Sequence, residues 1–346
     1  MAERTASAGG VREISYAEFE DTVTITADEA ATLRETCLAA AGRFSHDDLH
    51  DDEFIHTAEG LARHFPDRLR RKIWAFRDLG SVDGVLAVEG LPVEADEPTP
   101  KGPADEPGWR DIPVATLVQL SIMTMLGAPI SYAEEKSGKL IQDVYPRAGY
   151  EERQENAGSV LLELHTEDGF LRTPPDYLSL LCIRADHDSR AATVACGVRR
   201  VLNELSAEDL EILRQPRFKI FFSSSFTGGG QERWTGPIPV LTGPEDDPDL
   251  CVDLHGMAAV DDRAGLTLDR LRSCLEGNLI GAVLRRGSLL IIDNNAAVHG
   301  RTGFVPRYDG TDRWLRRCFV TKDLRRVRTD IIRGRVLRSR GRSPAG

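Results

Sequence analysis

The sequence predicts an α+β protein with a mainly β core, and three observations indicate this class. Short apolar runs separated by turn residues recur between residues 138 and 324. Longer segments with helical spacing of apolar residues dominate residues 13–137. No fixed-period repeat, coiled-coil heptad or low-complexity tract occurs in the 346 residues. About eight short strands at this spacing are typical of a double sheet or barrel, against which the helical part is expected to pack.

The N-terminal part is expected to begin with a flexible leader at residues 1–12 and to continue as helices. Residues 27–42 are predicted to form the first helix, because acidic residues in its first turn suit the positive end of the helix dipole. Residues 52–79 are expected to form one or two helices, interrupted near Pro66.

The stretch 112–133 carries no charge and is long enough to cross a membrane. Proline, glycine and polar residues interrupt it, so a buried core helix at about 111–127 is the better interpretation. A strand at residues 83–93 and an acidic, proline-rich surface loop at residues 94–108 are expected to precede this helix.

The β part is predicted from its apolar runs, which are GKLIQDVYP, SVLLELHTED, DYLSLLCIRA, ATVACG, FKIFFSSSF, IPVLTG, LCVDLHG, GSLLIIDNNAAVHG and WLRRCFVTKD. Two helices are expected to interrupt it, at residues 206–215 with Ser206 as N-cap, and at about 266–284. Residues 325–346 form a basic extension with eight arginines and one acid, either poorly ordered or an edge that closes over the helical part. The whole chain, residues 1–346, is expected to be one domain.

Composition excludes several classes of protein. The net charge of −11 argues against general affinity for nucleic acid or for an anionic membrane. The first twenty residues contain no apolar core of a secretory signal, so a cytoplasmic location is expected. The six cysteines are scattered without a Cys-x-x-Cys pair, which favours reduced structural thiols.

The motifs of phosphate-binding loops and serine hydrolases are missing, whereas the pattern His-x-acid occurs three times. Two of the three matches lie in the acidic run SHDDLHDDE, which is typical of a solvated segment. The third, His165 and Glu167, closes an apolar strand, and residues two apart on a strand share a face. With a third ligand from a distant strand, such a pair forms a facial triad for a metal ion.

A second segment, GSLLIIDNNAAVHGRTGF, supplies a candidate third ligand, His299, after a buried strand. Arg313 opens the next strand, with Arg316 and Arg317 beyond it. A metal-binding histidine followed by an arginine suits a dicarboxylate that chelates iron at one end and binds a guanidinium at the other. A solvated edge formed by the three arginines is the alternative.

Taken together, the segments GKLIQDVYP, AGSVLLELHTED, LEILRQP, DNNAAVHGRTGF and RYDGTDRWLRRCFV resemble those of the clavaminate synthase-like Fe(II)/2-oxoglutarate oxygenases, in particular the hydroxylases of free arginine and asparagine in peptide-antibiotic pathways. The resemblance spans residues 138–320 and implies a double-stranded β-helix, the cupin-like jelly roll, with helical additions.

The resemblance also implies roles for single residues. His165, Glu167 and His299 correspond to the iron ligands, and Arg313 and Thr193 to the residues that bind the distal carboxylate of 2-oxoglutarate. Because Glu167 is present instead of glycine or alanine, hydroxylation is favoured over halogenation.

The expected substrate is a free polar or basic L-α-amino acid, arginine-like or citrulline-like. One set of residues is expected to bind its α-carboxylate and amine, and another set its side chain. Arg317 corresponds to the residue that holds the α-carboxylate, and Glu135 stands near the position that binds the amine. Asp253 matches the first of two acids that bind a guanidinium in the family, and His255 replaces the second. The oligomeric state is not predicted.

The expected reaction is hydroxylation, at Cβ before Cγ, through a ferryl species formed from Fe(II), 2-oxoglutarate and O2, with release of succinate and CO2. Desaturation or ring closure on the same scaffold, and a non-catalytic cupin-like binding protein, are the alternatives. The glycine-rich segment 226–234 fits either a lid over the substrate or a plain surface loop.

Overall fold

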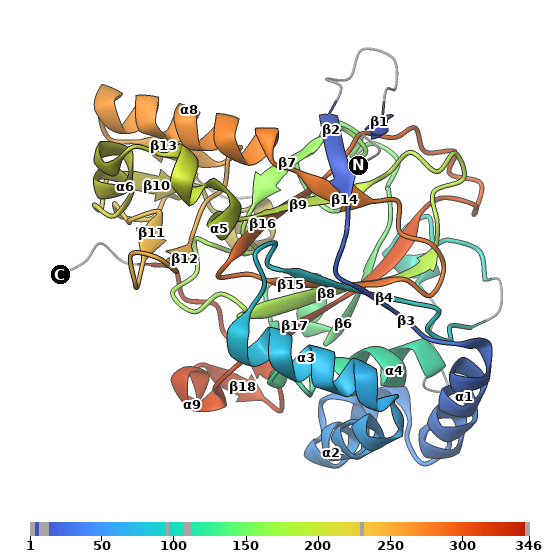
Figure 1. Ribbon diagram of the computed structural model, residues 1–346. Helices are drawn as coiled ribbons and strands as arrows, with labels where there is room; N and C mark the ends of the chain where they lie inside the picture. The colour runs from blue at the N-terminus through green and yellow to red at the C-terminus, as the bar shows by residue number, and fades with distance from the viewer. Residues whose placement is uncertain (1–3, 7–13, 95–96, 107–112, 229–231, 343–346) are drawn as a thin grey trace.

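The computed structural model describes the chain except residues 1–3, 7–13, 95–96, 107–112, 229–231 and 343–346. Its described part contains two large mixed sheets with helices packed on their outer faces (Figure 1). No helix in the described residues is long and apolar enough to span a membrane.

The larger sheet has nine strands and runs in the order β18-β19-β5-β17-β8-β15-β4-β3, with β6 also paired to β17. The bounds are β18 (Ile331–Arg333), β19 (Val336–Leu337), β5 (Ala128–Tyr132), β17 (Trp314–Thr321), β8 (Tyr177–Arg184), β15 (Leu289–Asp293), β4 (Val85–Glu89), β3 (Thr22–Thr24) and β6 (Ile141–Val144).

The second sheet has six strands in the order β1-β2-β14-β9-β16-β7. They are β1 (Arg4–Ala6), β2 (Ile14–Glu18), β14 (Ile280–Ala282), β9 (Thr193–Gly197), β16 (Ala297–Arg301) and β7 (Leu162–His165). Two small antiparallel pairs stand apart, formed by β10 (Phe218–Ile220) with β13 (Met257–Ala259) and by β11 (Leu241–Thr242) with β12 (Asp249–Leu250).

The helices cover the two sheets from opposite sides (Figure 1). Those that pack on the nine-stranded sheet are α1 (Ala27–Ala41), α2 (Asp52–Leu61), α3 (Asp67–Leu79) and α4 (Val114–Met123). Those on the side of the six-stranded sheet are α5 (Val198–Val201), α6 (Ala207–Leu213) and α8 (Asp262–Gly277), while the short α7 (Ser224–Thr227) and α9 (Leu324–Val327) lie in connecting segments.

Three apolar cores follow from this layering. The first lies between α1–α4 and the nine-stranded sheet, and the third lies between the six-stranded sheet and α6 and α8. The second lies between the sheets and contains Leu290 and Phe319 from one and Ala195 and Ala297 from the other. Because side chains alternate along a strand, every second residue of β9, β16 and β17 points into the space between the sheets.

Most predicted elements are present. The helix predicted at 27–42 is α1, and the break near Pro66 separates α2 from α3. Ser206 caps α6 by accepting a hydrogen bond from the backbone N–H of Asp209 at 3.1 Å. The predicted core helix is α4, buried along its whole length, although residues 107–112 before it lie outside the described part.

Several expectations were wrong in detail. The helix predicted at 266–284 begins at Asp262, after the N-cap Asp261, and ends at Gly277. Its supposed last turn is β14, which inserts between β2 and β9; at Gly281 a Cβ would lie 2.8 Å from the Thr193 carbonyl oxygen, so the strand packs too closely for a side chain. Residues 4–6 of the supposed leader pair with β2, and the N-terminal part supplies strands as well as helices.

The described part of the basic extension, residues 325–342, lies along the edge of the nine-stranded sheet and contacts the helical part. This is the second of the two arrangements expected for it. Its strand β19 pairs in parallel with β5, and Arg335 forms an ion pair with Asp52 of α2 at 2.8 Å. Further on, the Arg342 backbone N–H donates to the Phe170 carbonyl at 2.9 Å. Backbone pairing of this kind explains why arginine-rich composition alone did not make the segment a loose tail.

Candidate metal centre and active site

Strand register brings two of the predicted ligands together. His299 of β16 lies directly opposite His165 of β7, and their ring centroids are 4.4 Å apart. Glu167 follows two residues after His165, and its Oε2 lies 3.5 Å from His299 Nε2. One ligand atom from each of the three residues lies within 4.8 Å of the others, and no other His, Cys, Asp and Glu cluster of this kind occurs in the described residues.

The electrostatics of these three residues suit a metal ion. His165 Nδ1 lies 2.8 Å from the Glu163 carbonyl oxygen, which leaves Nε2 free. Burial and the neighbouring His165 lower the pKa of His299, so its imidazole is neutral. Burial alone would raise the pKa of Glu167, but the Arg317 guanidinium and His299 hold it well below its usual range. Two imidazoles and one carboxylate are the donor set of mononuclear Fe(II) sites with open positions.

A small cavity beside these ligands is lined by Arg313 and Thr193. Arg313 Nη2 donates to Thr193 Oγ1 at 3.0 Å, and both residues are buried. Arg313 has no ion pair with an acid among the described residues, and burial lowers its pKa to about 10. A buried cation without an anion is costly, so this cavity fits an anionic ligand.

Arg301 is a second cation of this cavity and was missed by the sequence analysis. It lies on β16 directly opposite Thr193 and is 3 % exposed. Its Nη2 donates to the Val160 carbonyl at 2.8 Å, whereas its Nε has no partner. Burial and the charge of Arg313 lower its pKa to about 9. Its position two residues after His299 could have indicated that it lies on the same face as that ligand, since residues two apart on a strand share a face.

The three predicted arginines do not form a solvated edge, and Arg313 directly precedes β17 instead of opening it. Arg313, Arg316 and Arg317 are 6 %, 1 % and 1 % exposed. Arg316 points toward the helical layer and pairs with Asp143, its Nε lying 3.4 Å from Oδ1. Arg317 points into the space between the sheets, in the direction opposite to that of Arg316.

Arg317 and Glu135 are two of the predicted substrate residues, and they contact each other. Arg317 also contacts Glu167 of the metal centre. Its Nη1 donates to Glu167 Oε1 at 2.8 Å, and its Nη2 contacts Glu135 and Gln142. Burial raises the pKa of Glu135 although Arg317 opposes this, and Glu135 Oε2 is buried without a partner.

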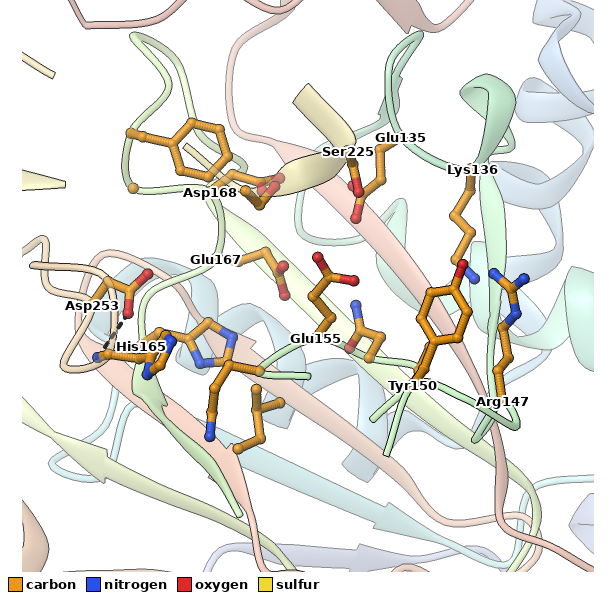
Figure 2. Close-up of a pocket in the computed structure, with 18 of the residues that line it drawn as sticks. Glu135, Lys136, Arg147, Tyr150, Glu155, His165, Glu167, Asp168, Ser225 and Asp253 are labelled. Atoms are coloured by element: carbon orange, nitrogen blue, oxygen red, sulfur yellow. Dashed lines mark hydrogen bonds between the residues drawn. The ribbon is translucent and has the colours of Figure 1, made fainter. Parts of the chain in front are cut away.

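Asp168, which the sequence analysis did not single out, lines the same region (Figure 2). It adopts a left-handed conformation with φ 52°, and its Oδ2 is buried and has no partner. Such strain at a non-glycine residue is typical of functional sites. Burial, together with Glu135 and Glu167, raises the pKa of Asp168 well above its usual range, and a bound cationic group would lower it again. The unpartnered oxygens of Glu135 and Asp168 can accept hydrogen bonds from such a group.

Asp253 and His255 line the main cavity of the site, which Glu135, Glu167 and Asp168 also line. Its volume is about 500 Å³. An isolated β-bridge places Asp253 beside His165, and Figure 2 shows the two side chains together. Asp253 Oδ1 accepts hydrogen bonds from the backbone N–H groups of His255 and Gly256 at 3.0 and 2.8 Å. The His255 side chain is 58 % exposed and lies at the rim, 3.8 Å from Glu163.

The glycine-rich segment predicted as lid or loop is only partly described. Ser223 and Ser225 before it line the main cavity, and Phe226 packs against Phe170 with ring centroids 5.1 Å apart. Residues 229–231 lie outside the described part of the chain.

The chain is similar to known proteins in both sequence and structure. No family model matches the chain. It is 41 % identical over 278 residues to the L-asparagine oxygenase of Streptomyces coelicolor, covering 80 % of this chain and 83 % of that protein. It is 33 % identical to clavaminate synthase 2 of Streptomyces clavuligerus, covering 80 % and 85 %. A solved asparagine oxygenase in complex with Fe(II), (2S,3S)-3-hydroxyasparagine and succinate matches with a TM-score of 0.84 and 39 % identity, over 91 % of this chain and 98 % of that one.

Proposed function

This chain belongs to the clavaminate synthase-like Fe(II)/2-oxoglutarate-dependent oxygenases, and from that premise we propose that it hydroxylates Cβ of a free L-α-amino acid with a short carboxamide side chain, L-asparagine above all. The observation that carries the proposal is the set of His165, Glu167 and His299 beside the buried, acid-free Arg313. The two facing sheets support a double-stranded β-helix in a single domain.

Iron and 2-oxoglutarate are the cofactor and cosubstrate of this enzyme class, and the residues present fit both. His165, Glu167 and His299 would hold Fe(II). Arg313 and Thr193 would bind the distal carboxylate of 2-oxoglutarate, with Arg301 adding positive potential in the same cavity. The bound pair supplies oxidation of a C–H bond by O2, coupled to decarboxylation of 2-oxoglutarate to succinate and CO2.

The backbone groups of the amino acid would bind on the other side of the metal ligands. Arg317 would donate to the α-carboxylate, and the free oxygens of Glu135 and Asp168 would accept from the α-ammonium. Both acids are buried, which strengthens their interaction with a cation and excludes water. This arrangement orients the carbon chain of the substrate relative to the metal centre.

Asp253 supports a carboxamide instead of the arginine-like side chain expected from the sequence. Its Oδ1 already accepts two backbone hydrogen bonds, so only Oδ2 remains for a ligand. A guanidinium is bound best by two parallel hydrogen bonds and a second acid, and the residue in that place, His255, is exposed at the rim. One free oxygen matches the single NH2 group of an amide. Because Asp253 is paired to His165, a short side chain reaching it would keep Cβ near the metal centre.

The experiment has two stages. Anaerobic addition of Fe(II) and 2-oxoglutarate is expected to produce a weak visible charge-transfer band that His165→Ala abolishes. Succinate release and product mass are then measured with L-asparagine, L-aspartate, L-glutamine, L-arginine and L-citrulline. L-Aspartate is the matched control, since it has the shape of L-asparagine but presents oxygens to Asp253.

We expect a product 16 Da heavier from L-asparagine and none from L-aspartate. Higher kcat/KM with L-arginine or L-citrulline would refute the carboxamide assignment. Products 2 Da lighter would show desaturation or ring closure. A chain that gives no band at all would refute the oxygenase assignment and favour a binding protein.

A further inference from the structure

Glu167 lies where the strand ladder that holds the metal ligands has ended. Strand β7 ends at His165, which pairs with His299, and the Thr166 backbone N–H donates to the Val252 carbonyl at 2.8 Å. Glu167 is 7 % exposed, so its backbone N–H and C=O groups need partners other than water.

The side-chain amide of Asn294 supplies both partners. Its Oδ1 accepts from the Glu167 backbone N–H at 2.6 Å, and its Nδ2 donates to the Glu167 carbonyl at 3.0 Å. The same Nδ2 donates to the Pro175 carbonyl at 2.9 Å. An amide has one acceptor and one donor group, as a peptide unit has, so Asn294 replaces one missing rung of the ladder. Asn294 is 3 % exposed, where such hydrogen bonds are strongest.

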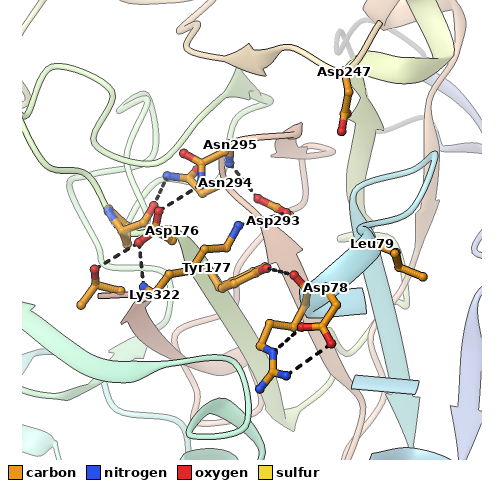
Figure 3. A network of polar contacts seen from close by, with 12 residues as sticks. Asp78, Leu79, Asp176, Tyr177, Asp247, Asp293, Asn294, Asn295 and Lys322 are labelled. Atoms are coloured by element: carbon orange, nitrogen blue, oxygen red, sulfur yellow. Dashed lines mark hydrogen bonds and ion pairs between the residues drawn. The ribbon is translucent and has the colours of Figure 1, made fainter. Parts of the chain in front are cut away.

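Asn294 is itself held firmly in the turn between β15 and β16. Its backbone N–H donates to the Asp176 carbonyl at 3.0 Å. Figure 3 shows Asn294 and Asn295 beside Asp176, whose carboxylate also accepts from the Lys322 backbone N–H at 2.8 Å. The turn thus connects to the start of β8 and the end of β17.

The hairpin of β15 and β16 therefore controls two of the three ligands. It carries His299 on β16, and through Asn294 it fixes the backbone of Glu167. The residue after Glu167, Asp168, has a left-handed φ of 52°, so the chain turns away there. A carboxylate ligand binds well only if its backbone holds the side chain at the correct distance.

We propose that Asn294 is a positioning residue that sets the geometry of the metal centre by clamping the backbone of Glu167. This inference rests on the proposed function, because it assigns Glu167 as a ligand. Asn294 touches neither the metal donors' side-chain atoms nor the cavity, so it acts only through Glu167.

The test compares Asn294→Ala and Asn294→Asp with the control Asn295→Ala. Asn295 lies in the same turn and donates to Asp176 Oδ1 at 3.2 Å, but it has no hydrogen bond to Glu167. Asn294→Asp keeps the size and the acceptor but replaces the NH2 donor with an oxygen. Three quantities are measured without turnover: the Kd for Fe(II) under anaerobic conditions, the charge-transfer band with 2-oxoglutarate, and the unfolding midpoint.

We expect both Asn294 variants to weaken Fe(II) binding by about 10- to 100-fold and to shift or weaken the band, whereas Asn295→Ala stays within about threefold of the wild type. If Asn294→Ala does not fold, the comparison is made with Asn294→Asp.

Two results would overturn the inference. One is a folded Asn294 variant with the wild-type Kd and band. The other is an equal change in Asn295→Ala, which would mean that the turn as a whole matters and not the clamp. A wild-type chain that binds neither Fe(II) nor 2-oxoglutarate would instead refute the proposed function, so the two failures are distinguishable.

Discussion

Replacing Arg313 with methionine should change ligand binding and stability in opposite directions. Arg313 is buried, donates to Thr193, and has no acidic ion-pair partner among the described residues. In the proposed function its partner is the distal carboxylate of 2-oxoglutarate. Methionine is similar in length and apolar, so Arg313→Met removes the charge with little change in packing.

The expected loss of affinity follows from breaking a buried charge pair. Removing one partner of such a pair costs about 2–5 kcal/mol. At about 1.4 kcal/mol for each factor of ten, the Kd for 2-oxoglutarate should rise by about 30- to 5,000-fold. The increase in unfolding midpoint that 2-oxoglutarate gives the wild-type protein should disappear with it.

Without ligand, the same change should stabilise the protein. The pKa of Arg313 falls from 12.5 to about 10 through burial, so the folded chain disfavours this charge. The unfolded chain binds the proton more tightly, so the charge of Arg313 lowers the free energy of unfolding. This loss of stability is fully present below about pH 10 and is relieved as pH rises above it. That shift corresponds to about 3 kcal/mol, from which about 1 kcal/mol is subtracted for the lost hydrogen bond to Thr193. A gain of about 2 kcal/mol is the expected upper limit at pH 7.

Arg316→Met is the matched control, because Arg316 lies three residues after Arg313, on β17, but faces the helical layer. It leaves Asp143 buried without its guanidinium, so it should lower stability by about 3–5 kcal/mol and leave 2-oxoglutarate binding unchanged. Unfolding is followed by urea titration, and binding by anaerobic titration of the charge-transfer band. Arg313→Met with a wild-type Kd, or with lower stability than the wild type, would refute the reasoning.

Three further outcomes are expected. Arg301→Met should also raise the Kd for 2-oxoglutarate, but less than Arg313→Met does, because one Arg301 nitrogen is already used by a backbone carbonyl; equal Kd changes would contradict this. Removal of residues 336–346 should lower the unfolding midpoint, since β19 and its neighbours pair with β5 and with the segment after the metal ligands; an unchanged midpoint would show that these contacts are dispensable. Burial raises the pKa of Cys37 to about 12, so a thiol reagent at pH 8 should label the native protein fastest at the less buried Cys274; rapid labelling of Cys37 would argue for local opening.

The metal ligands were within reach of sequence reasoning because strand periodicity is local. Counting residues predicts that His165 and Glu167 share a face, although β7 ends at His165 and Glu167 lies just beyond it. Arg301 follows His299 on β16 by the same rule. What counting residues does not reveal is which strands pair. The register that sets His299 opposite His165 joins segments more than 130 residues apart, and only the resemblance to a family supplied that pairing beforehand.

Contacts between a side chain and a distant backbone could not be predicted at all. Asn294 belongs to the motif DNNAAVHGRTGF, but nothing in the neighbouring residues indicates that its amide binds Glu167. The error at β14 has a related cause. Residues 279–284 continue the apolar spacing of helix α8, and only the partners β2 and β9, both distant in sequence, make them a strand.

The charges around Arg317 explain why a free amino acid fits this site. Arg317 contacts two acids, Glu135 and Glu167, and the second would be neutralised by a bound metal ion. What then remains is the buried pair of Arg317 and Glu135, beside Asp168, whose pKa burial and the nearby acids raise well above its usual range. A zwitterion adds one charge of each sign, so its carboxylate and ammonium groups can both be paired without leaving a buried charge unmatched. An amino acid attached to a carrier through its carboxyl group lacks the anion, and would bury Arg317 against an uncharged carbonyl. In the proposed function, the same site would therefore select the free amino acid by charge, and Asp253 would distinguish one side chain from another.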